Sequence, residues 1–494
     1  MKYISSRDRR VSLLASQAIL QGISKEGGLF VPDEIPIIKN LERLKGKNYK
    51  ELTFEIMNRF LDDFDPDVIK ICIDKAYDNK FTEEEIAPLI KVGEAYFLEL
   101  FHGPTFAFKD MALSILPYLL KEAIKINNVH REVVILTATS GDTGKAALEG
   151  FANIEGIKII VFYPEEGVSD IQKRQMITQE GDNTFVVGIK GNFDDAQNGV
   201  KEIFSDRNFA DVLDRHNFVL SSANSINIGR LLPQMVYYFH SYLTLLKRGD
   251  ICQGEKINVV VPTGNFGNIL AAYYAKKMGL PINRLICASN ENNVLRDFLN
   301  TGNYDKRREL ILTSSPSMDI LISSNLERLL FHLSDGDDQL INGTMKKLDI
   351  DGFYQMESLD LGEFYGGSSL EAETSSSILS VFKNQGYLMD PHSAVAFGVY
   401  HKYKLESGDN LKTVIVSTAS PFKFASKVAS SIGIDIDLMD EFSVIEELEN
   451  RTGGKAPEAI KSLKNKTIVH NNKCDKKDMA AIVKSFLNVG ESDD

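Results

Sequence analysis

The chain has 494 residues, enough for two to four domains of about 150 residues each. Hydrophobic residues make up 43% and charged residues 25%, as in an ordinary globular protein. The formal net charge of −13 and the lack of a basic cluster argue against a nucleic-acid partner, and no apolar run approaches the ~18 residues of a transmembrane helix.

The N-terminal segment has the order of a secretory signal, with basic residues ahead of a partly apolar run, VSLLASQAIL. The basic residues are Lys2, Arg7, Arg9 and Arg10. Asp8 interrupts them, and Ser12 and Gln17 break the run, whereas a true signal has a continuous apolar block of ~7–15 residues. We therefore predict an amphipathic helix here and a cytoplasmic protein.

Residues 1–92 carry helical patterns such as SLLASQAILQGI and YKELTFEIMNRFLDDF, which predict a small, mostly helical N-terminal domain. From residue 93 the pattern changes to short β-branched runs followed by turns and helices, which indicates buried parallel strands in βαβ units. The expected strands are VVILTA (133–138), IKIIVFYP (157–164), INVVVPT (257–263), RLICASN (284–290) and KTVIVSTA (412–419). The fold class is therefore α/β, with open, mostly parallel sheets and helices on both faces. Ligands of such sheets bind beyond the carboxyl ends of the strands.

The region 93–494 is expected to form one catalytic unit with two parts. A smaller, mobile α/β subdomain covers about 131–235, and a larger one covers 93–130 plus 236–494. The polar, irregular segment at about 291–355 predicts an insertion on the larger sheet. The lysine-rich tail ends in a helix, DMAAIVKSFLN (478–488), which we expect to dock on the surface.

Lys109 lies in an apolar and aromatic stretch, FHGPTFAFKDMAL (101–113). Burial of an unpaired ammonium is so costly that such a lysine loses its proton or finds a partner. One interpretation is a lysine at a helix start, whose stem packs while its head reaches water. The other is a nucleophile that forms a Schiff base with an aldehyde, which needs a lowered pKa and a dry site. The segment alone leaves both open.

The loop GNFGN (264–268) follows an expected strand and precedes an expected helix. Its two glycines let backbone N–H groups converge, and the helix aims unpaired amides and its positive end into the same space. These features make a phosphate site of Gly264, Asn265, Phe266, Gly267 and Asn268. A tight turn in which glycine only relieves strain is the alternative. A dinucleotide site is disfavoured because the G-x-G-x-x-G spacing is absent.

The loop TSGDTG (139–144) also ends a strand and opens a helix. The hydroxyls of Thr139, Ser140 and Thr143 and the amides at the helix start suit an anion such as a substrate carboxylate. Plain capping by Ser140 or Asp142, worth about 1 kcal/mol, is the alternative. A nucleotide-triphosphate loop is excluded because Thr139 stands where that motif requires its first glycine.

Two further polar stretches lie in expected loops. Thr418, in STASPFKF (417–424), brings a hydroxyl to the carboxyl edge of the sheet or simply caps a turn. In SSANSINIGRLLPQ (221–234), Ser225, Asn227 and Arg230 share one turn, where Arg230 can clamp a phosphate or the others can cap a helix. A buried lysine, two anion loops and a lone hydroxyl together fit a pyridoxal phosphate enzyme, whose cofactor needs a Schiff-base lysine, a phosphate seat and a partner for its ring nitrogen.

The chain also resembles a known family. HGPTFAFKDMAL, TSGDTG, NSINIGR, PTGNFGN, SPSMDILISSNLERLLF and STASPFKF are similar, in order and spacing, to motifs of threonine synthases. The opening MKYISSRD and the segment ILQGISKEGGLFVPDEIP resemble the long form found in bacteria and fungi. The resemblance implies a tryptophan-synthase-β-like fold (pyridoxal phosphate fold type II) and the cofactor pyridoxal 5′-phosphate. It also implies γ-elimination of phosphate from O-phospho-L-homoserine and β-addition of water, which gives L-threonine in the last step of its biosynthesis.

The resemblance also implies roles for single residues. Lys109 is the Schiff-base lysine and proton shuttle, residues 264–268 cradle the cofactor phosphate, Thr418 faces the pyridine nitrogen, and Asp142 lies beside the cofactor's 3′-oxygen. The candidates for substrate contacts are Thr139, Ser140, Thr143, Ser225, Asn227 and Arg230. Ser420 departs from the histidine expected in much of the family, which puts any role of that histidine in doubt.

Two other functions also fit these residues. A phospholyase or dehydratase of the same fold that releases 2-oxobutyrate is one alternative, and a non-catalytic metabolite-binding homologue is another. The four widely spaced cysteines and eight scattered histidines predict no metal site and suit a reducing compartment. We expect a monomer or homodimer with a small-molecule substrate and without nucleic-acid or membrane partners.

Overall fold

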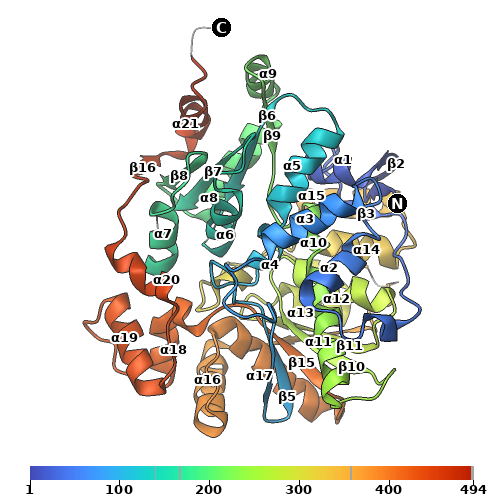
Figure 1. The fold of residues 1–494 in the computed structure, drawn as a ribbon, viewed down its shortest axis with the longest axis vertical. Helices are drawn as coiled ribbons and strands as arrows, with labels where there is room; N and C mark the ends of the chain where they lie inside the picture. The colour runs from blue at the N-terminus through green and yellow to red at the C-terminus, as the bar shows by residue number, and fades with distance from the viewer. Residues whose placement is uncertain (140, 166–167, 357–358, 491–494) are drawn as a thin grey trace.

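In the computed structural model, which describes residues 1–139, 141–165, 168–356 and 359–490, two mostly parallel sheets organise the chain (Figure 1). The larger sheet has the order β14 (Phe364–Ser368), β11 (Ile282–Ser289), β10 (Ile257–Pro262), β15 (Thr413–Ser417), β5 (Ala95–Glu99) and β4 (Leu89–Val92). The smaller has the order β16 (Asn472–Cys474), β8 (Thr184–Ile189), β7 (Ile157–Pro164), β6 (Glu132–Ala138) and β9 (Phe218–Ser221). Neighbouring strands are parallel except for β4 and β5. The predicted fold class is confirmed.

Helices cover both sheets, and this explains why the strands are continuously apolar. All six residues of β10 are buried, as expected for a parallel strand packed on both faces. The helices connecting the strands of the smaller sheet are α6 (Asp142–Phe151), α7 (Asp170–Ile177), α8 (Phe193–Ser205) and α9 (Arg207–Arg215). The larger sheet carries, among others, α11 (Gln234–Arg248), α12 (Gly267–Lys277), α16 (Glu371–Gln385) and α17 (Pro391–Ser407). Figure 1 shows the smaller sheet above the larger one.

The N-terminal segment combines helices with a small antiparallel sheet that its sequence did not predict. The helices are α1 (Ala15–Gln21), α2 (Tyr49–Met57) and α3 (Pro66–Ala76), and the strands are β1 (Tyr3–Ser5), β2 (Asp8–Leu13) and β3 (Phe30–Pro32). The amphipathic helix expected from residue 12 begins at Ala15, because Leu14 is extended and the residues before it pair with β1. Strands of three to six residues leave too short a pattern to be separated from a helix.

The insertion at 291–355 is more regular than expected. It contains α13 (Val294–Thr301), α14 (Leu326–Leu333), α15 (Asp338–Asp351) and the antiparallel pair β12 (Asn303–Asp305) and β13 (Phe353–Gln355). A short 3-10 turn, η2 (Pro316–Met318), lies between these elements. This turn brings the insertion to the functional site described below.

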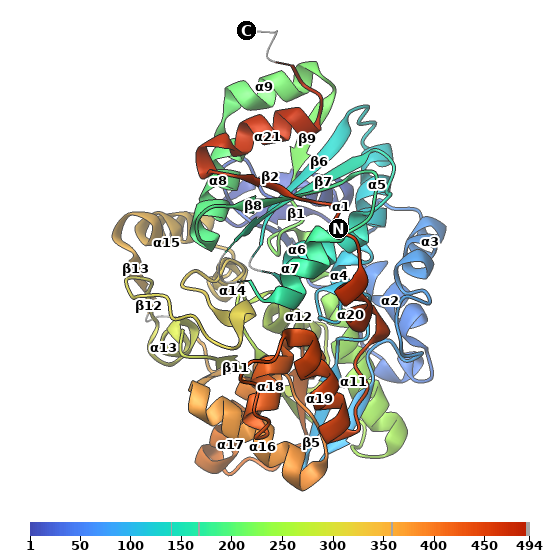
Figure 2. The same cartoon turned by 90° about the vertical axis from the view of Figure 1, so that its left-hand side faces the viewer.

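The C-terminal tail completes the smaller sheet instead of only docking on its surface. Strand β16 pairs in parallel with β8, and α21 (Met479–Phe486) packs on the same sheet. Met479 and Val483 share a hydrophobic cluster with Val134 and Val187, and Figure 2 shows α21 beside α8. The smaller sheet thus includes a strand that lies far beyond residue 235. Among the described residues, no helix combines the length and apolar composition that crossing a bilayer requires.

Arg328 joins the N-terminal segment to the insertion. Its side chain is fully buried and donates to the carbonyl oxygens of Phe30 (2.9 Å) and Ile226 (2.5 Å) and to Asn325 Oδ1.

We expect Arg328→Met to cost about 3 kcal/mol of stability, because buried acceptors lose their donor. The variant should therefore melt at a lower temperature in scanning calorimetry. Arg10→Met, which removes an exposed pair with Asp8, is the control and should melt like the unmodified protein; equal melting of both variants would contradict the prediction.

Candidate active site

A cavity of about 620 Å³ opens beyond the carboxyl ends of β6, β10 and β15. This is the position at which α/β sheets bind ligands, and the volume suits a small molecule. The cavity brings together most of the residues that the sequence singled out. They are Lys109, Thr139, Asp142, Thr143, Ser225, Arg230, Gly264, Asn265, Phe266, Gly267, Asn268 and Thr418. Ser140 lies outside the described residues.

The backbone around Lys109 is bonded to the segment that carries Thr418. The amide of Phe108 donates to the Thr418 carbonyl at 2.8 Å, and the amide of Ser420 donates to the Phe106 carbonyl at 3.1 Å. Phe106 adopts a φ of +60°, a conformation that is costly for a residue with a side chain and persists only where neighbours hold it. These contacts set Lys109, the first turn of α4 (Asp110–Leu113) and Thr418 in one rigid unit.

The amine of Lys109 is buried among polar groups. The residue is 9% exposed, and its Nζ lies 3.4 Å from Asp142 Oδ2, 3.1 Å from Ser317 Oγ and 5.1 Å from the centre of the Phe108 ring. Burial lowers the pKa of Lys109, although the Asp142 carboxylate opposes this change. The amine is therefore shielded from water, unlike that of a lysine whose head reaches solvent.

Lys423 is a site residue that the sequence reasoning missed. It lies in η3 (Pro421–Phe424), is fully buried, and places Nζ 2.8 Å from Asp142 Oδ1 and 2.9 Å from the Thr105 carbonyl. Burial alone would raise the pKa of Asp142, but Lys423 and Lys109 outweigh it and hold this pKa well below its usual range. The signal was present in the sequence, because a phenylalanine directly precedes the lysine in PFKF, as it does at Lys109 in FAFK.

The loop 264–268 offers unpaired donors to an anion. Phe266 has a φ of +61° and turns the chain so that α12 begins at Gly267 with its first amides free of helical partners. Asn268 Oδ1 accepts from the hydroxyls of Tyr237 and Tyr238, both at 2.5 Å. Its Nδ2 is buried and has no hydrogen-bond partner among the described residues. An orphaned donor and free helix amides beside Lys109 fit the phosphate and aldehyde ends of pyridoxal phosphate.

The motif SPSMDILISSN (315–325) packs on the 264–268 loop. This contact was not predicted from the sequence. Ser323 Oγ donates to the Gly264 carbonyl at 2.7 Å, and Asn325 donates to the Asn265 carbonyl through its amide (3.1 Å) and its Nδ2 (2.9 Å). A Cβ at position 264 would lie 2.5 Å from the Ser317 carbonyl oxygen. Glycine at 264 is therefore required for η2 to approach the cavity.

Arg230 and Asn227 separate into two roles. Arg230 lines the cavity, is 3% exposed and uses Nη1 on the Ala223 carbonyl at 3.0 Å, while its Nε has no partner among the described residues. Burial lowers the pKa of Arg230 to about 10. Asn227 does not line the cavity; its Oδ1 accepts from Gly229 N at 2.9 Å and caps the short helix α10 (Ile228–Leu231). Asn227 is therefore a helix cap. Arg230 supplies the donor of this turn, its Nε, that has no partner among the described residues.

Thr139 and Thr143 also lie at the cavity. Thr139 Oγ1 accepts from Gly141 N (3.0 Å) and Gly144 N (2.8 Å), so this hydroxyl shapes its own loop.

The described residues contain no group of three or more His, Cys, Asp or Glu side chains arranged to hold a metal ion.

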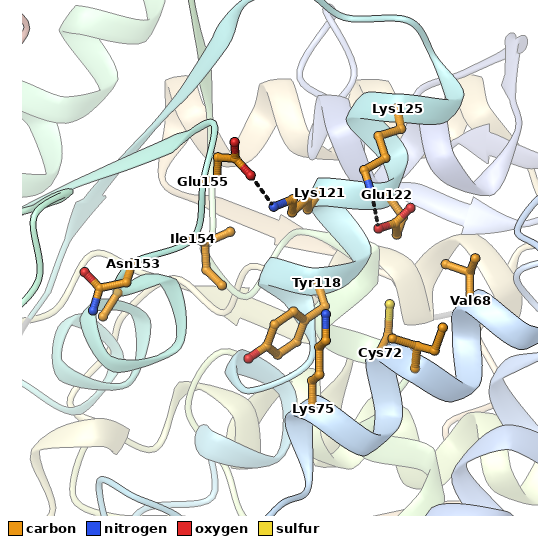
Figure 3. A pocket seen from close by; sticks show the side chains of 12 residues that line it. Val68, Cys72, Lys75, Tyr118, Lys121, Glu122, Lys125, Asn153, Ile154 and Glu155 are labelled. Atoms are coloured by element: carbon orange, nitrogen blue, oxygen red, sulfur yellow. Dashed lines mark hydrogen bonds and ion pairs between the residues drawn. The ribbon is translucent and has the colours of Figure 1, made fainter.

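A second cavity of about 830 Å³ lies between α3, α5 (Leu116–Ile126) and residues 152–155 (Figure 3). Two of its lysines pair with carboxylates, Lys121 with Glu155 at 3.1 Å and Lys125 with Glu122 at 2.7 Å, and Lys75 Nζ lies 5.8 Å from the centre of the Tyr118 ring. Burial raises the pKa of the Cys72 thiol in its wall to about 12, which disfavours the reactive thiolate. This cavity lacks the free buried donors that distinguish the first one.

The fold and the site define a pyridoxal-phosphate dependent enzyme, and the family model of that description matches residues 84–419. Models described as threonine synthase N terminus and threonine synthase, C-terminal match residues 2–77 and 393–465. The chain belongs to the threonine synthase family.

Individual relatives agree with this assignment. The chain is similar to threonine synthase of Saccharomyces cerevisiae, with 36% identity over 87% of this chain and 88% of the relative. It is 41% identical to threonine synthase-like 1 of Pongo abelii over 85% of this chain, and it spans 58% of the length of that protein. The crystal structure of pyridoxal phosphate-bound threonine synthase from Brucella melitensis matches with a TM-score of 0.87 and 34% identity, over 100% of both chains.

Proposed function

We propose that the protein converts O-phospho-L-homoserine and water to L-threonine and inorganic phosphate, with pyridoxal 5′-phosphate as cofactor. One observation carries the proposal: the buried amine of Lys109 shares a single cavity with the free donors of the 264–268 loop and with Arg230. An amine for an aldehyde and two separate anion sites are what this cofactor and a phosphorylated amino acid require.

The charges around the cavity favour an anionic substrate. Apart from Lys109, the cationic residues that line it are Lys201, Arg230, Lys306 and Arg307, the last of which pairs with Asp305, whereas the lining carboxylates are Asp142 and Asp319. The carboxylate of Asp142 already forms an ion pair with Lys423. The cavity is therefore locally positive although the whole chain carries −13, and such a field concentrates a phosphorylated substrate.

The chain's own groups have distinct tasks. When bound, pyridoxal phosphate supplies an aldehyde that takes up the substrate amine and a conjugated ring that accepts electrons. Lys109, the donors of 264–268 and Thr418 would hold it. Lys109 Nζ takes and returns the protons at the substrate carbons, because burial favours its uncharged form. Asp142, fixed by Lys423, stays charged and orients that amine.

The decisive experiment is incubation with O-phosphohomoserine and pyridoxal phosphate, with phosphate and the organic product both measured. L-Threonine released in step with phosphate supports the proposal. Release of 2-oxobutyrate selects a phospholyase, and release of neither L-threonine nor 2-oxobutyrate selects a non-catalytic homologue.

A cytoplasmic location and a monomeric or homodimeric state remain predictions, to be checked by cell fractionation and by sedimentation of the purified protein.

Arg230 is the proposed ligand of the substrate phosphate. We expect Arg230→Lys to raise KM for the phosphorylated substrate about tenfold or more with a smaller effect on kcat, because an ammonium cannot replace the planar fork of a guanidinium. Inhibition by inorganic phosphate should weaken in parallel. Arg248→Lys, which changes an arginine that donates to the Leu89 carbonyl, is the matched control. If KM and phosphate inhibition stay as in the unmodified protein, Arg230 does not bind the phosphate.

A further inference from the structure

Three elements meet at Ser317 in the turn η2. Its Oγ accepts a hydrogen bond from Lys109 Nζ at 3.1 Å and donates to Asp142 Oδ2 at 3.1 Å. Its backbone N–H donates to His392 Nε2 at 3.3 Å. One serine of the insertion thus touches the amine of Lys109, the carboxylate at the start of α6 and an imidazole at the start of α17.

The imidazole of His392 is held in the form that this contact requires. His392 is 2% exposed, and its Nδ1 lies 2.7 Å from Oδ1 of Asp390, which is fully buried. Asp390 also accepts from the backbone N–H of His392 at 2.9 Å, as the N-cap of α17. A backbone N–H can only donate, so Nε2 presents its lone pair to Ser317 and the ring hydrogen lies on Nδ1, directed at Asp390 Oδ1.

The position of Ser317 is also fixed from its other side. The Ser317 carbonyl oxygen lies against Gly264, where a Cβ would approach it to 2.5 Å. The serine is therefore held between the 264–268 loop and His392, with its hydroxyl directed at Lys109 Nζ. A residue that only closed a turn would have no need of three polar contacts with groups of the cavity.

We propose that Ser317 is a further catalytic residue, whose hydroxyl holds and orients the Lys109 amine whenever that amine is free of the cofactor, and that His392 and Asp390 position it. The inference rests on the proposed function, because that function makes Lys109 the reacting amine. No net proton transfer is assigned to Ser317: its Oγ–H remains donated to Asp142 while its lone pair accepts from Nζ.

The first test needs no substrate. In the full-length protein freed of pyridoxal phosphate, the pH dependence of acetylation of each lysine by acetic anhydride is followed by mass spectrometry. The charged groups that face Lys109 are Asp142 from α6, Lys423 from η3 and Arg230 from α10, and they are the same in every variant. Ser317→Ala removes an acceptor of the ammonium, so the labelling midpoint of Lys109 should move to lower pH. Ser314→Ala, in the same segment but bonded to Glu371 at 3.0 Å, should leave it in place.

The second test separates orientation from folding. In the enzyme loaded with pyridoxal phosphate, Ser317→Ala should lower kcat about tenfold to a hundredfold with KM within about threefold, because misplacement of the amine slows every proton transfer. Ser317→Cys, of similar size but a weak acceptor, serves if the alanine variant folds poorly. The Ser314→Ala control should have the melting temperature of the unmodified protein.

The role of His392 is tested by amide exchange over residues 313–322. His392→Leu should speed exchange there and shift the Lys109 labelling midpoint as Ser317→Ala does, whereas His392→Gln, which keeps an acceptor near the place of Nε2, should restore both. An unmoved Lys109 midpoint in Ser317→Ala overturns the catalytic assignment, and unchanged exchange in His392→Leu overturns the positioning role. Failure of the proposed function looks different: the labelling shifts persist while no substrate is turned over.

Discussion

We expect Lys109→Ala to lower turnover about 10³-fold or more, because it removes the amine that we propose binds the cofactor and moves the protons. The variant should also lose the cofactor absorbance that depends on a covalent bond to lysine. Treatment of the unmodified protein with borohydride should fix a pyridoxyl group on the peptide that contains Lys109, and the variant should carry none.

The matched control for this variant is another buried lysine. Lys145 is also 9% exposed, but its Nζ pairs with Glu149 at 2.9 Å and it does not line the cavity. Lys145→Ala should still carry the borohydride-fixed group on Lys109. A label on any residue other than Lys109 in the unmodified protein would overturn the assignment of the reacting amine.

Lys423→Met should be the most destabilising single change at the site. The substitution leaves the Asp142 carboxylate, which is 5% exposed, without its nearest cation. Breaking a buried pair on one side costs about 3–5 kcal/mol, and loss of activity should follow because Asp142 also contacts Lys109. The earlier thermal transition would be read by calorimetry, and kcat/KM by the phosphate assay.

A double substitution shows whether the charge pair is the cause. Asp142→Asn in the Lys423→Met background removes the unpaired carboxylate, so the double variant should melt later than Lys423→Met alone. Lys427→Met, four residues along the chain, removes a partly exposed pair with Glu371 and should change the melting temperature little. If Lys423→Met has the melting temperature of the unmodified protein, the ion pair between Lys423 and Asp142 does not stabilise the site.

The local pattern of residues was enough to predict the fold class, five strands of the two main sheets and most of the residues that line the cavity. The expected strands at 133–138, 157–164 and 257–263 agree with β6, β7 and β10 to within one residue at each end. This succeeded because a strand covered on both faces is continuously apolar, a signal contained in one short segment. The loops followed, because parallel strands bring their carboxyl ends to one edge whatever their order in the sheet.

Which side chains face each other across the cavity depended on the tertiary structure. Lys423 and Asp142 lie 281 positions apart and form one ion pair, and η2 reaches Lys109 only because the insertion folds back on Gly264. The tail likewise adds β16 to a sheet built from residues 132–221. The chain by itself determined its fold class and the chemistry of its loops, since both follow from neighbours in sequence. The partners of each charge were decided by packing, since a buried charge is stabilised by whichever group the fold brings within a few ångströms.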